Sequence, residues 1–137
     1  MRSKLINQLK EHEGIRLKPY RCTANKLTIG IGRNIEDRGI TEDEAEYLLN
    51  NDIDICIEEL EKNLPWFYQL HETARLVLVD MCFNMGMPRL MQFKKTLNYL
   101  ADQDYAAAAV EMLDSRWARQ VGSRAKHLSY QLKSLDK

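Results

Sequence analysis

Residues 41–62 restrict the fold of this chain most, because they predict one long, half-exposed helix with structure on both sides of it. Thr41-Glu42-Asp43-Glu44 is a capping box, in which Thr41 and Glu44 satisfy each other's backbone N–H groups at a helix start. Pro65 lies just beyond the expected helix end. Apolar side chains recur on one helical face at Ala45, Leu48, Leu49, Ile53, Cys56 and Leu60.

A β-hairpin is predicted before this helix. Ile15–Arg21 and Leu27–Ile31 have the composition of strands, and Asn25 in the turn between them tolerates a positive φ. Two glycines in and just after the second run, Gly30 and Gly32, indicate a close backbone approach or a sharp bend.

The remaining chain is predicted to be helical. Residues 74–85 are apolar nearly all round, as in a central buried helix. Amphipathic or short helices are expected at residues 3–12, 90–100, 105–113, from 116 to a break at Gly122, and 124–132. The fold class is therefore α+β, mostly α. We expect a single domain over 1–137, with a β-rich lobe at 13–40, a connecting helix at 41–62, and a helical lobe of 65–137 plus 1–12.

Composition excludes several classes of protein. Twenty basic and twenty acidic residues give no net charge, which argues against nucleic acid as a partner. The cysteines at 22, 56 and 82 and the three scattered histidines match no metal site or disulfide framework, and we expect no cofactor. Cys56 and Cys82 are expected to pack in the core. No apolar run is long enough to cross a bilayer, and the N-terminus lacks the pattern of a signal peptide.

Glu13 is the first candidate for chemistry. It lies at the end of the first helical pattern, directly before Gly14 and the hairpin. A partly dry environment would raise the pKa of its carboxyl above about 4.3 and keep it protonated for a leaving oxygen. The alternative is an ordinary surface glutamate beside an unfavourable helix C-terminus. Spacing alone favours this second interpretation.

Resemblance to a known family changes that balance. Separate stretches, in order along nearly the whole chain, resemble the phage lysozymes of glycoside hydrolase family 24: residues 13–23, 27–32, 39–46, 80–86, 115–117 and 124–126. The resemblance implies a lysozyme-like fold and hydrolysis of the β-1,4 bond between N-acetylmuramic acid and N-acetylglucosamine in peptidoglycan. By position, it makes Glu13 the general acid and gives Thr28 the role of holding the attacking water.

One position departs from the family pattern. The family's second acidic residue, an Asp, falls at position 22, which is Cys here. In an inverting enzyme the second group helps water to attack from the opposite face of the sugar. A thiol has a pKa of about 8.5 and is mostly protonated near neutrality unless its neighbours lower that value. Cys22 is therefore a base or a nucleophile, a passive lining residue beside Glu13 and Thr28, or the mark of a degenerate site.

Other residues have both a binding and a structural interpretation. Tyr20 and Phe83 offer apolar faces to a sugar ring, or pack at a lobe junction. By the resemblance, Asn34, Thr96 and Glu111 fall at positions that touch substrate, and Arg124 at a cleft arginine, with a helix-start salt bridge as its alternative. Arg33 is expected to pair with Asp52, or else to be solvated. Trp117 is expected in the core of the helical lobe.

The resemblance implies an endolysin that acts on the peptidoglycan glycan strand and lyses a bacterial host. We expect a monomer without stable membrane insertion. It would remain in the host cytoplasm until lysis, with release that depends on a holin, and then act on the periplasmic cell wall. Two alternatives remain open: an inactive wall-binding module on the same scaffold, and a lytic transglycosylase, which needs one acid and no base to activate water.

Overall fold

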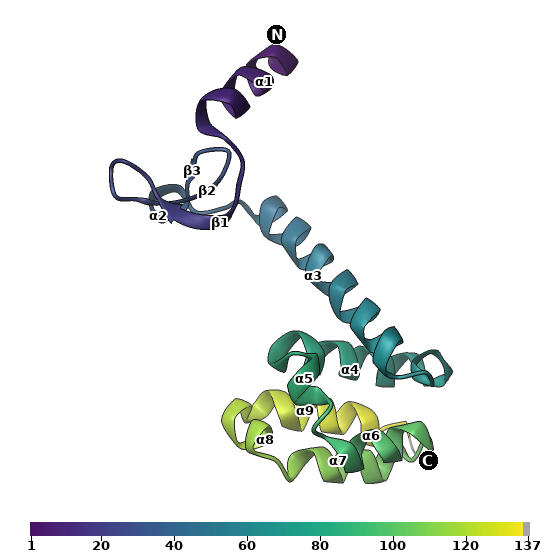
Figure 1. Cartoon of the computed structure of the whole chain (residues 1–137). Coiled ribbons are helices and arrows are strands. Elements are labelled where there is room, and N and C mark those ends of the chain that lie inside the picture. Colours follow the sequence, from purple (N-terminus) through teal and green to yellow (C-terminus); the bar gives the residue numbers. More distant parts are fainter. Residues whose placement is uncertain (136–137) are drawn as a thin grey trace. The chain divides into compact units, whose positions relative to one another are not determined.

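The computed structural model describes residues 1–135. The chain divides into two compact units, with the division after Leu48. This division lies inside α3 (Glu42–Asn63), the long helix that the capping box predicted. Figure 1 shows the order of the elements along the chain. The mostly helical α+β composition expected from sequence is confirmed; the assignment of residues 1–12 to a helical lobe stays a prediction.

The first unit holds a small sheet between short helices. Its elements are α1 (Arg2–Glu13), β1 (Arg16–Arg21), β2 (Leu27–Gly30), β3 (Arg33–Asn34), α2 (Ile35–Arg38) and the start of α3. The three strands are antiparallel in the order β1-β2-β3. The predicted hairpin is confirmed, including a positive φ of 60° at Asn25. β3 and α2 were not predicted, because runs of two and four residues are too short to show a periodicity.

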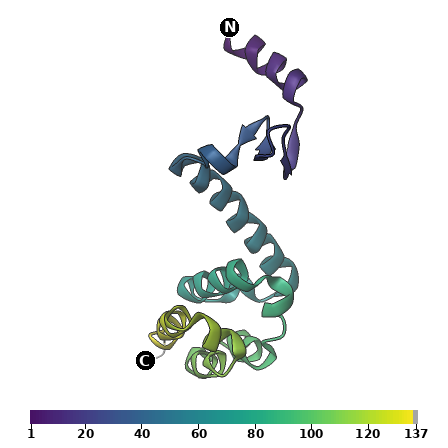
Figure 2. The same cartoon turned by 90° about the vertical axis from the view of Figure 1, so that its left-hand side faces the viewer.

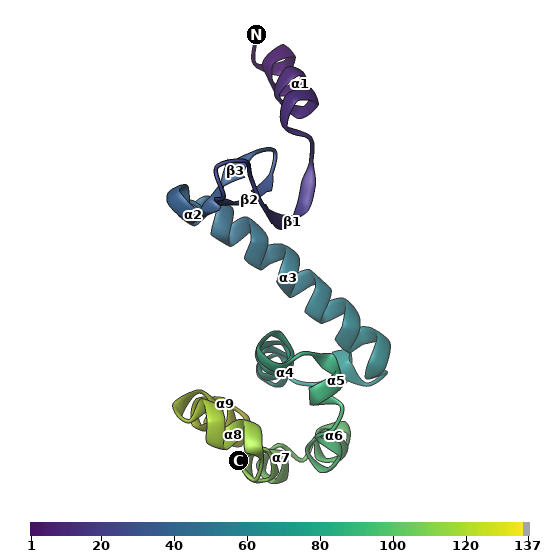
Figure 3. The same cartoon turned by 60° about the vertical axis from the view of Figure 1, so that its left-hand side comes forward.

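Glu36 fixes α2 against the hairpin, beside β2 and β3 (Figure 3). Its carboxylate accepts the backbone N–H of Leu27 at 3.1 Å and a hydrogen bond from the Arg21 guanidinium at 3.2 Å. The Lys26 ammonium lies 3.7 Å away. The N–H of Leu27, followed by the two cations, holds the pKa of Glu36 below its ordinary value of 4.5. The carboxylate thus ties α2 to the end of β1 and the start of β2.

Glu44 closes the entry to α3. Its carboxylate accepts the N–H of Thr41 at 2.8 Å, and the Thr41 hydroxyl accepts the N–H of Glu44 at 3.1 Å, which confirms the capping box. The same carboxylate pairs with Arg33 at 2.6 Å, and Arg33 also donates to the carbonyl of Gly39 at 3.0 Å. The expected Arg33–Asp52 pair is therefore wrong, and so is a solvated Arg33. Glu44, in the first turn of α3, pairs with Arg33 in place of Asp52 because its carboxylate already faces β3.

The carboxylates of Glu36 and Glu44 predict that the protein loses stability in acid. The Thr41 N–H and Arg33 also lower the pKa of Glu44 below 4.5. A lowered folded-state pKa gives stability that is complete above the unfolded value and is lost as the pH falls through the folded value. The melting temperature should therefore decline below about pH 4.5, and a Glu36→Gln/Glu44→Gln variant should decline less steeply. Thermal melts monitored by circular dichroism between pH 7 and pH 2.5 measure both slopes; equal slopes would contradict this assignment.

The second unit is helical. It contains the rest of α3, the 3-10 helix η1 (Phe67–Gln69), and α4 (Glu72–Met85), α5 (Met87–Leu90), α6 (Lys94–Ala101), α7 (Tyr105–Leu113), α8 (Arg116–Val121) and α9 (Ser123–Lys133). In it α9 packs along α7 and against α4 and α8 (Figure 2). The continuous helix expected at 90–100 is wrong. Short-range bonds from the N–H groups of Gln92 and Phe93 to Arg89 and Leu90 end α5, and α6 begins anew after Phe93.

Trp117 is central to the core of this unit, as expected. It is 3% exposed, its ring meets that of Phe93 edge to face at 6.0 Å, and its indole N–H donates to Asn84 at 2.7 Å. Cys56 and Cys82 lie in the same core as free thiols, which confirms their packing role. Within residues 1–135 no helix is long and apolar enough to span a membrane.

Candidate functional site

Three of the predicted site residues form one row across the sheet. Thr28, in the central strand, is paired with Tyr20 on β1 and with Asn34 on β3. Directly paired residues of antiparallel strands project from the same face, with their Cβ atoms about 4.5–5.5 Å apart. Thr28 is 3% exposed, whereas its two partners are partly exposed. The register therefore gathers a hydroxyl, a phenol and an amide on one side of a three-stranded sheet.

Cys22 lies next to this row, at the turn after β1. It follows the end of β1, its N–H donates to the carbonyl of Lys26 at 3.0 Å, and its carbonyl accepts the N–H of Asn25 at 2.8 Å. Hydrogen bonds to the sulfur, first from the backbone of Lys26 and then from the Thr28 hydroxyl, hold the pKa of the thiol below its ordinary value of 9.0. The turn therefore raises the fraction of thiolate at a given pH, and the thiolate is the form that accepts a proton or attacks as a nucleophile.

Two acceptors, the carbonyl of Lys26 and the sulfur of Cys22, compete for the single hydrogen of the Thr28 hydroxyl. In the structure it donates to the carbonyl of Lys26 at 2.8 Å. Donation to the sulfur of Cys22 therefore requires the hydroxyl to turn away from that carbonyl. While it donates to Lys26, its oxygen keeps free lone pairs and can accept a hydrogen bond from water.

The three thiols should differ sharply in reactivity. Cys22 is partly exposed with a lowered pKa, whereas Cys56 and Cys82 are buried. Burial raises the pKa of Cys56, and it raises that of Cys82 to about 12. Iodoacetamide at neutral pH should therefore add one adduct, at Cys22, with a rate that rises to its plateau at a midpoint below pH 9.0. Peptide mapping by mass spectrometry checks the site, and modification of Cys56 or Cys82 first would contradict it.

Glu13 lies at the end of α1, against the bend after β2. Gly14, with a φ of 74°, ends the helix there, and its N–H bonds to the carbonyl of Lys10 at 2.8 Å. The carboxylate of Glu13 reaches Gly32 so closely that a Cβ built on Gly32 would lie 2.5 Å from Oε2. Of the two glycines expected to mark a close backbone approach or a sharp bend, Gly32 shows the close approach, whereas nothing lies within 4 Å of a Cβ built on Gly30. The expected burial of Glu13 is wrong: its side chain is exposed, and α1 contains no buried residue.

Tyr20 and Asn34 also have structural partners. The Arg16 guanidinium lies over the Tyr20 ring, 4.4 Å from its centroid. The Asn34 side chain caps α2 by accepting the N–H of Asp37 at 3.1 Å. Arg16 therefore covers the Tyr20 ring, so that the phenol oxygen is the part of Tyr20 that a ligand would meet. The Asn34 oxygen is already engaged in the fold.

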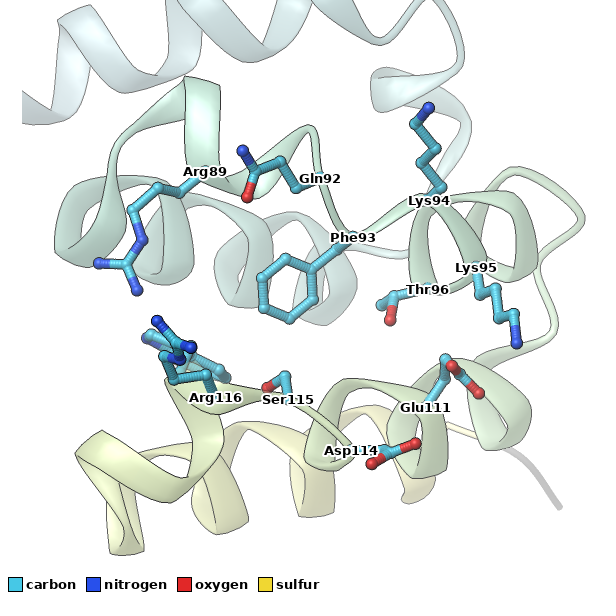
Figure 4. Close-up of a pocket in the computed structure, with 11 residues that line it drawn as sticks. Arg89, Gln92, Phe93, Lys94, Lys95, Thr96, Glu111, Asp114, Ser115 and Arg116 are labelled. Carbon is cyan, nitrogen blue, oxygen red and sulfur yellow. The ribbon is translucent and has the colours of Figure 1, made fainter.

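Thr96 lines a cavity of about 580 Å³ in the second unit (Figure 4). Phe93 and Thr96 face the segment from 114 to 116 across this cavity. Thr96 itself is 2% exposed, which leaves it at the floor. The lining also includes Glu111, which the resemblance likewise predicts at a position that touches substrate. The sequence analysis did not predict the charged residues of this lining, of which only Arg116 lies in a stretch that resembles the family: Arg89, Lys94, Lys95, Asp114 and Arg116.

Phe83 and Arg124 belong to the second unit as well. Phe83, on α4, is 45% exposed, which leaves its ring free to meet a ligand. Arg124, in the first turn of α9, forms a salt bridge with Asp80 of α4 at 2.6 Å. The structural alternative for Arg124 is therefore present in the fold. Its predicted role near Glu13 stays a prediction.

Comparison with known proteins gives one consistent result. A probable T4-type lysozyme from Dictyostelium discoideum is 27% identical over an alignment of 157 positions, which covers 93% of this chain and 92% of that protein. An endolysin from Acyrthosiphon pisum secondary endosymbiont phage 1 is 31% identical and covers 81% of this chain and 75% of its own length. An endolysin from Bacillus phage B103 is 30% identical, with 45% of its length covered. The family model described as phage lysozyme matches residues 10–133. The chain therefore belongs to the phage lysozyme family, whose enzymes are of the glycosidase type.

Proposed function

We propose that the protein is a muramidase that hydrolyses the β-1,4 bond between N-acetylmuramic acid and N-acetylglucosamine in peptidoglycan. The observation that carries this proposal is the arrangement of the first unit. Glu13 is held against the bend after β2, and a thiol of lowered pKa contacts Thr28 in the same sheet. The phage lysozyme family supplies the reaction class.

Glu13 acts as the general acid in this proposal. Its carboxyl is exposed in the free protein, and a sugar bound over the bend at Gly32 would shield it from water. Removal from water favours the protonated form of a carboxyl, which is the form that a general acid needs. The carboxyl then gives its proton to the oxygen that leaves the cleaved bond. Catalytic hydrogen bonds often form only in the substrate complex, which is consistent with an exposed acid here.

Thr28 and Cys22 handle the water on the other side of the reaction. With its hydrogen donated to the Lys26 carbonyl, the Thr28 oxygen accepts a hydrogen bond from the attacking water and so orients it. Cys22 as thiolate takes the second proton of that water. The backbone of Lys26 is the largest cause of the lowered pKa of Cys22 and does not use the Thr28 hydrogen. A lowered pKa raises the thiolate fraction, which favours the base role over a passive lining residue.

Substrate contacts are proposed for five further residues. Two lie beside Thr28 in the sheet, and three lie in the second unit: Tyr20, Asn34, Phe83, Thr96 and Arg124. We propose ring stacking for the aromatic pair and hydrogen bonding for the others. Alanine variants that raise KM with unchanged kcat would support uniform substrate binding, and unchanged KM would remove a residue from this set.

The same reasoning extends to the cellular role. We propose that the protein acts as a monomer on the glycan strand and lyses a bacterial host. It would wait in the host cytoplasm until the membrane is opened by a holin, and would then reach the periplasmic wall.

Clearing of chloroform-treated Gram-negative cells tests the activity. Loss of turbidity with new reducing ends on the released muropeptides would support hydrolysis. Anhydro-sugar ends would instead identify a lytic transglycosylase. Binding to walls without clearing would identify an inactive wall-binding module.

Alkylation then tests Cys22 in the active protein. A Cys56→Ala/Cys82→Ala variant carries Cys22 as its only thiol. A base role requires that iodoacetamide abolish clearing in step with adduct formation. Cys22→Ala controls for the bulk of the adduct, since it removes the thiol without adding volume. Full clearing by this variant would make Cys22 a passive lining residue.

A further inference from the structure

Gly32 is the residue closest to the proposed acid. A Cβ at this position would lie 2.5 Å from Oε2, 2.8 Å from Cδ and 3.0 Å from Cγ of Glu13. Protein atoms do not approach this closely without a bond, so no side chain fits at position 32 while Glu13 keeps its place. The contact lies inside the first unit, between the end of α1 and the bend that joins β2 to β3.

We propose that Gly32 is a positioning residue, whose missing side chain leaves the space in which the Glu13 carboxyl is seated. This inference rests on the proposed function of Glu13. Glu13 is exposed, and its carboxyl lies close against the Gly32 backbone, so this backbone limits how far the carboxyl can move toward the bend. An added methyl group would push the carboxyl away, because the atoms in its path are the end of a flexible side chain.

Gly30 provides a matched control. Its φ is +73° against +69° for Gly32, so alanine meets the same left-handed backbone strain at either position. Nothing lies within 4 Å of a Cβ built on Gly30. The two alanine variants therefore share the cost in stability and differ in the contact with Glu13.

The test compares kcat and KM for wall hydrolysis in Gly32→Ala and Gly30→Ala. Displacement of a reacting group by about 1 Å can reduce the rate about 100-fold, and we expect a loss of this order in kcat for Gly32→Ala. KM should stay near the wild-type value. Gly30→Ala should keep kcat close to wild type. Equal losses in the two variants would overturn the proposal, because strain alone would then explain them.

A second measurement follows Glu13 without relying on activity. In protein labelled with ¹³C at the glutamate side-chain carboxyls, the Glu13 signal is assigned by its disappearance in Glu13→Gln. This signal should move in Gly32→Ala and stay in place in Gly30→Ala; an unmoved signal in Gly32→Ala would overturn the proposal. If Gly32→Ala fails to fold, Gly32→Asn and Gly30→Asn replace the pair, since asparagine tolerates positive φ better. Full activity of Glu13→Gln would refute the proposed function instead, and would leave the seating of Glu13 to be decided by the signal.

Discussion

Glu13→Gln should lower kcat for wall lysis by about 10²–10⁴-fold, the usual contribution of a general acid. Glutamine has nearly the same size and keeps a hydrogen-bonding end, but it has no proton to give to the leaving oxygen. Because the side chain of Glu13 is exposed and the substitution hardly changes its size, the fold and the melting temperature should stay unchanged. The clearing rate of chloroform-treated cells, measured at saturating substrate, gives the change.

Glu11→Gln is the matched control for this experiment. Glu11 lies on the same helix and is also exposed, so its substitution removes an equal charge from the same element. Its clearing rate should equal that of the wild type. A Glu13→Gln protein with wild-type clearing would remove Glu13 from the mechanism, while membership of the family would stand.

Trp117→Ala should reduce the free energy of unfolding by about 3–5 kcal/mol, as expected for a large aromatic residue removed from a core. The ring is almost fully buried against Phe93, and the indole N–H supplies a hydrogen bond to Asn84. The cavity left by alanine would be too large for its walls to close by small shifts. Urea unfolding monitored by far-ultraviolet circular dichroism at pH 7 measures the loss.

Tyr130→Ala provides the comparison for this effect. Tyr130 also lies in the second unit, on α9, but it is 72% exposed, so its removal should change stability by less than about 0.5 kcal/mol. Equal changes in the two variants would show that Trp117 does not anchor the core.

Helical periodicity and turn chemistry were enough to predict most of the fold. α7 begins and ends at the residues expected, and the capping box located the start of α3. The break between α5 and α6 was missed because residues 90–100 keep a helical pattern of apolar residues through it. That pattern records which face is buried, and it does not record where the backbone turns.

The identity of the site residues stays a prediction, whereas the environment of some of them can be compared with the structure. Resemblance named Thr28 and Cys22; the register pairs Thr28 with Tyr20, and Cys22 follows directly after the end of β1, where Thr28 helps to lower the pKa of its thiol. The burial of Glu13 was wrong, because solvent exposure depends on packing that no local pattern encodes. The partner of Arg33 was wrong for a related reason: several acidic residues follow position 41, and sequence spacing does not tell which one reaches β3.

The two halves of the long helix α3 are anchored in the protein by different interactions. Its two buried side chains, Cys56 and Leu60, both lie in its second half. The first half contains no buried side chain; its start is held by the capping box and by the hydrogen bonds that Arg33 donates to Glu44. Amide hydrogens near Tyr47 should therefore exchange with deuterium sooner than those near Leu60. The first half of this continuous helix should open more often than the second half.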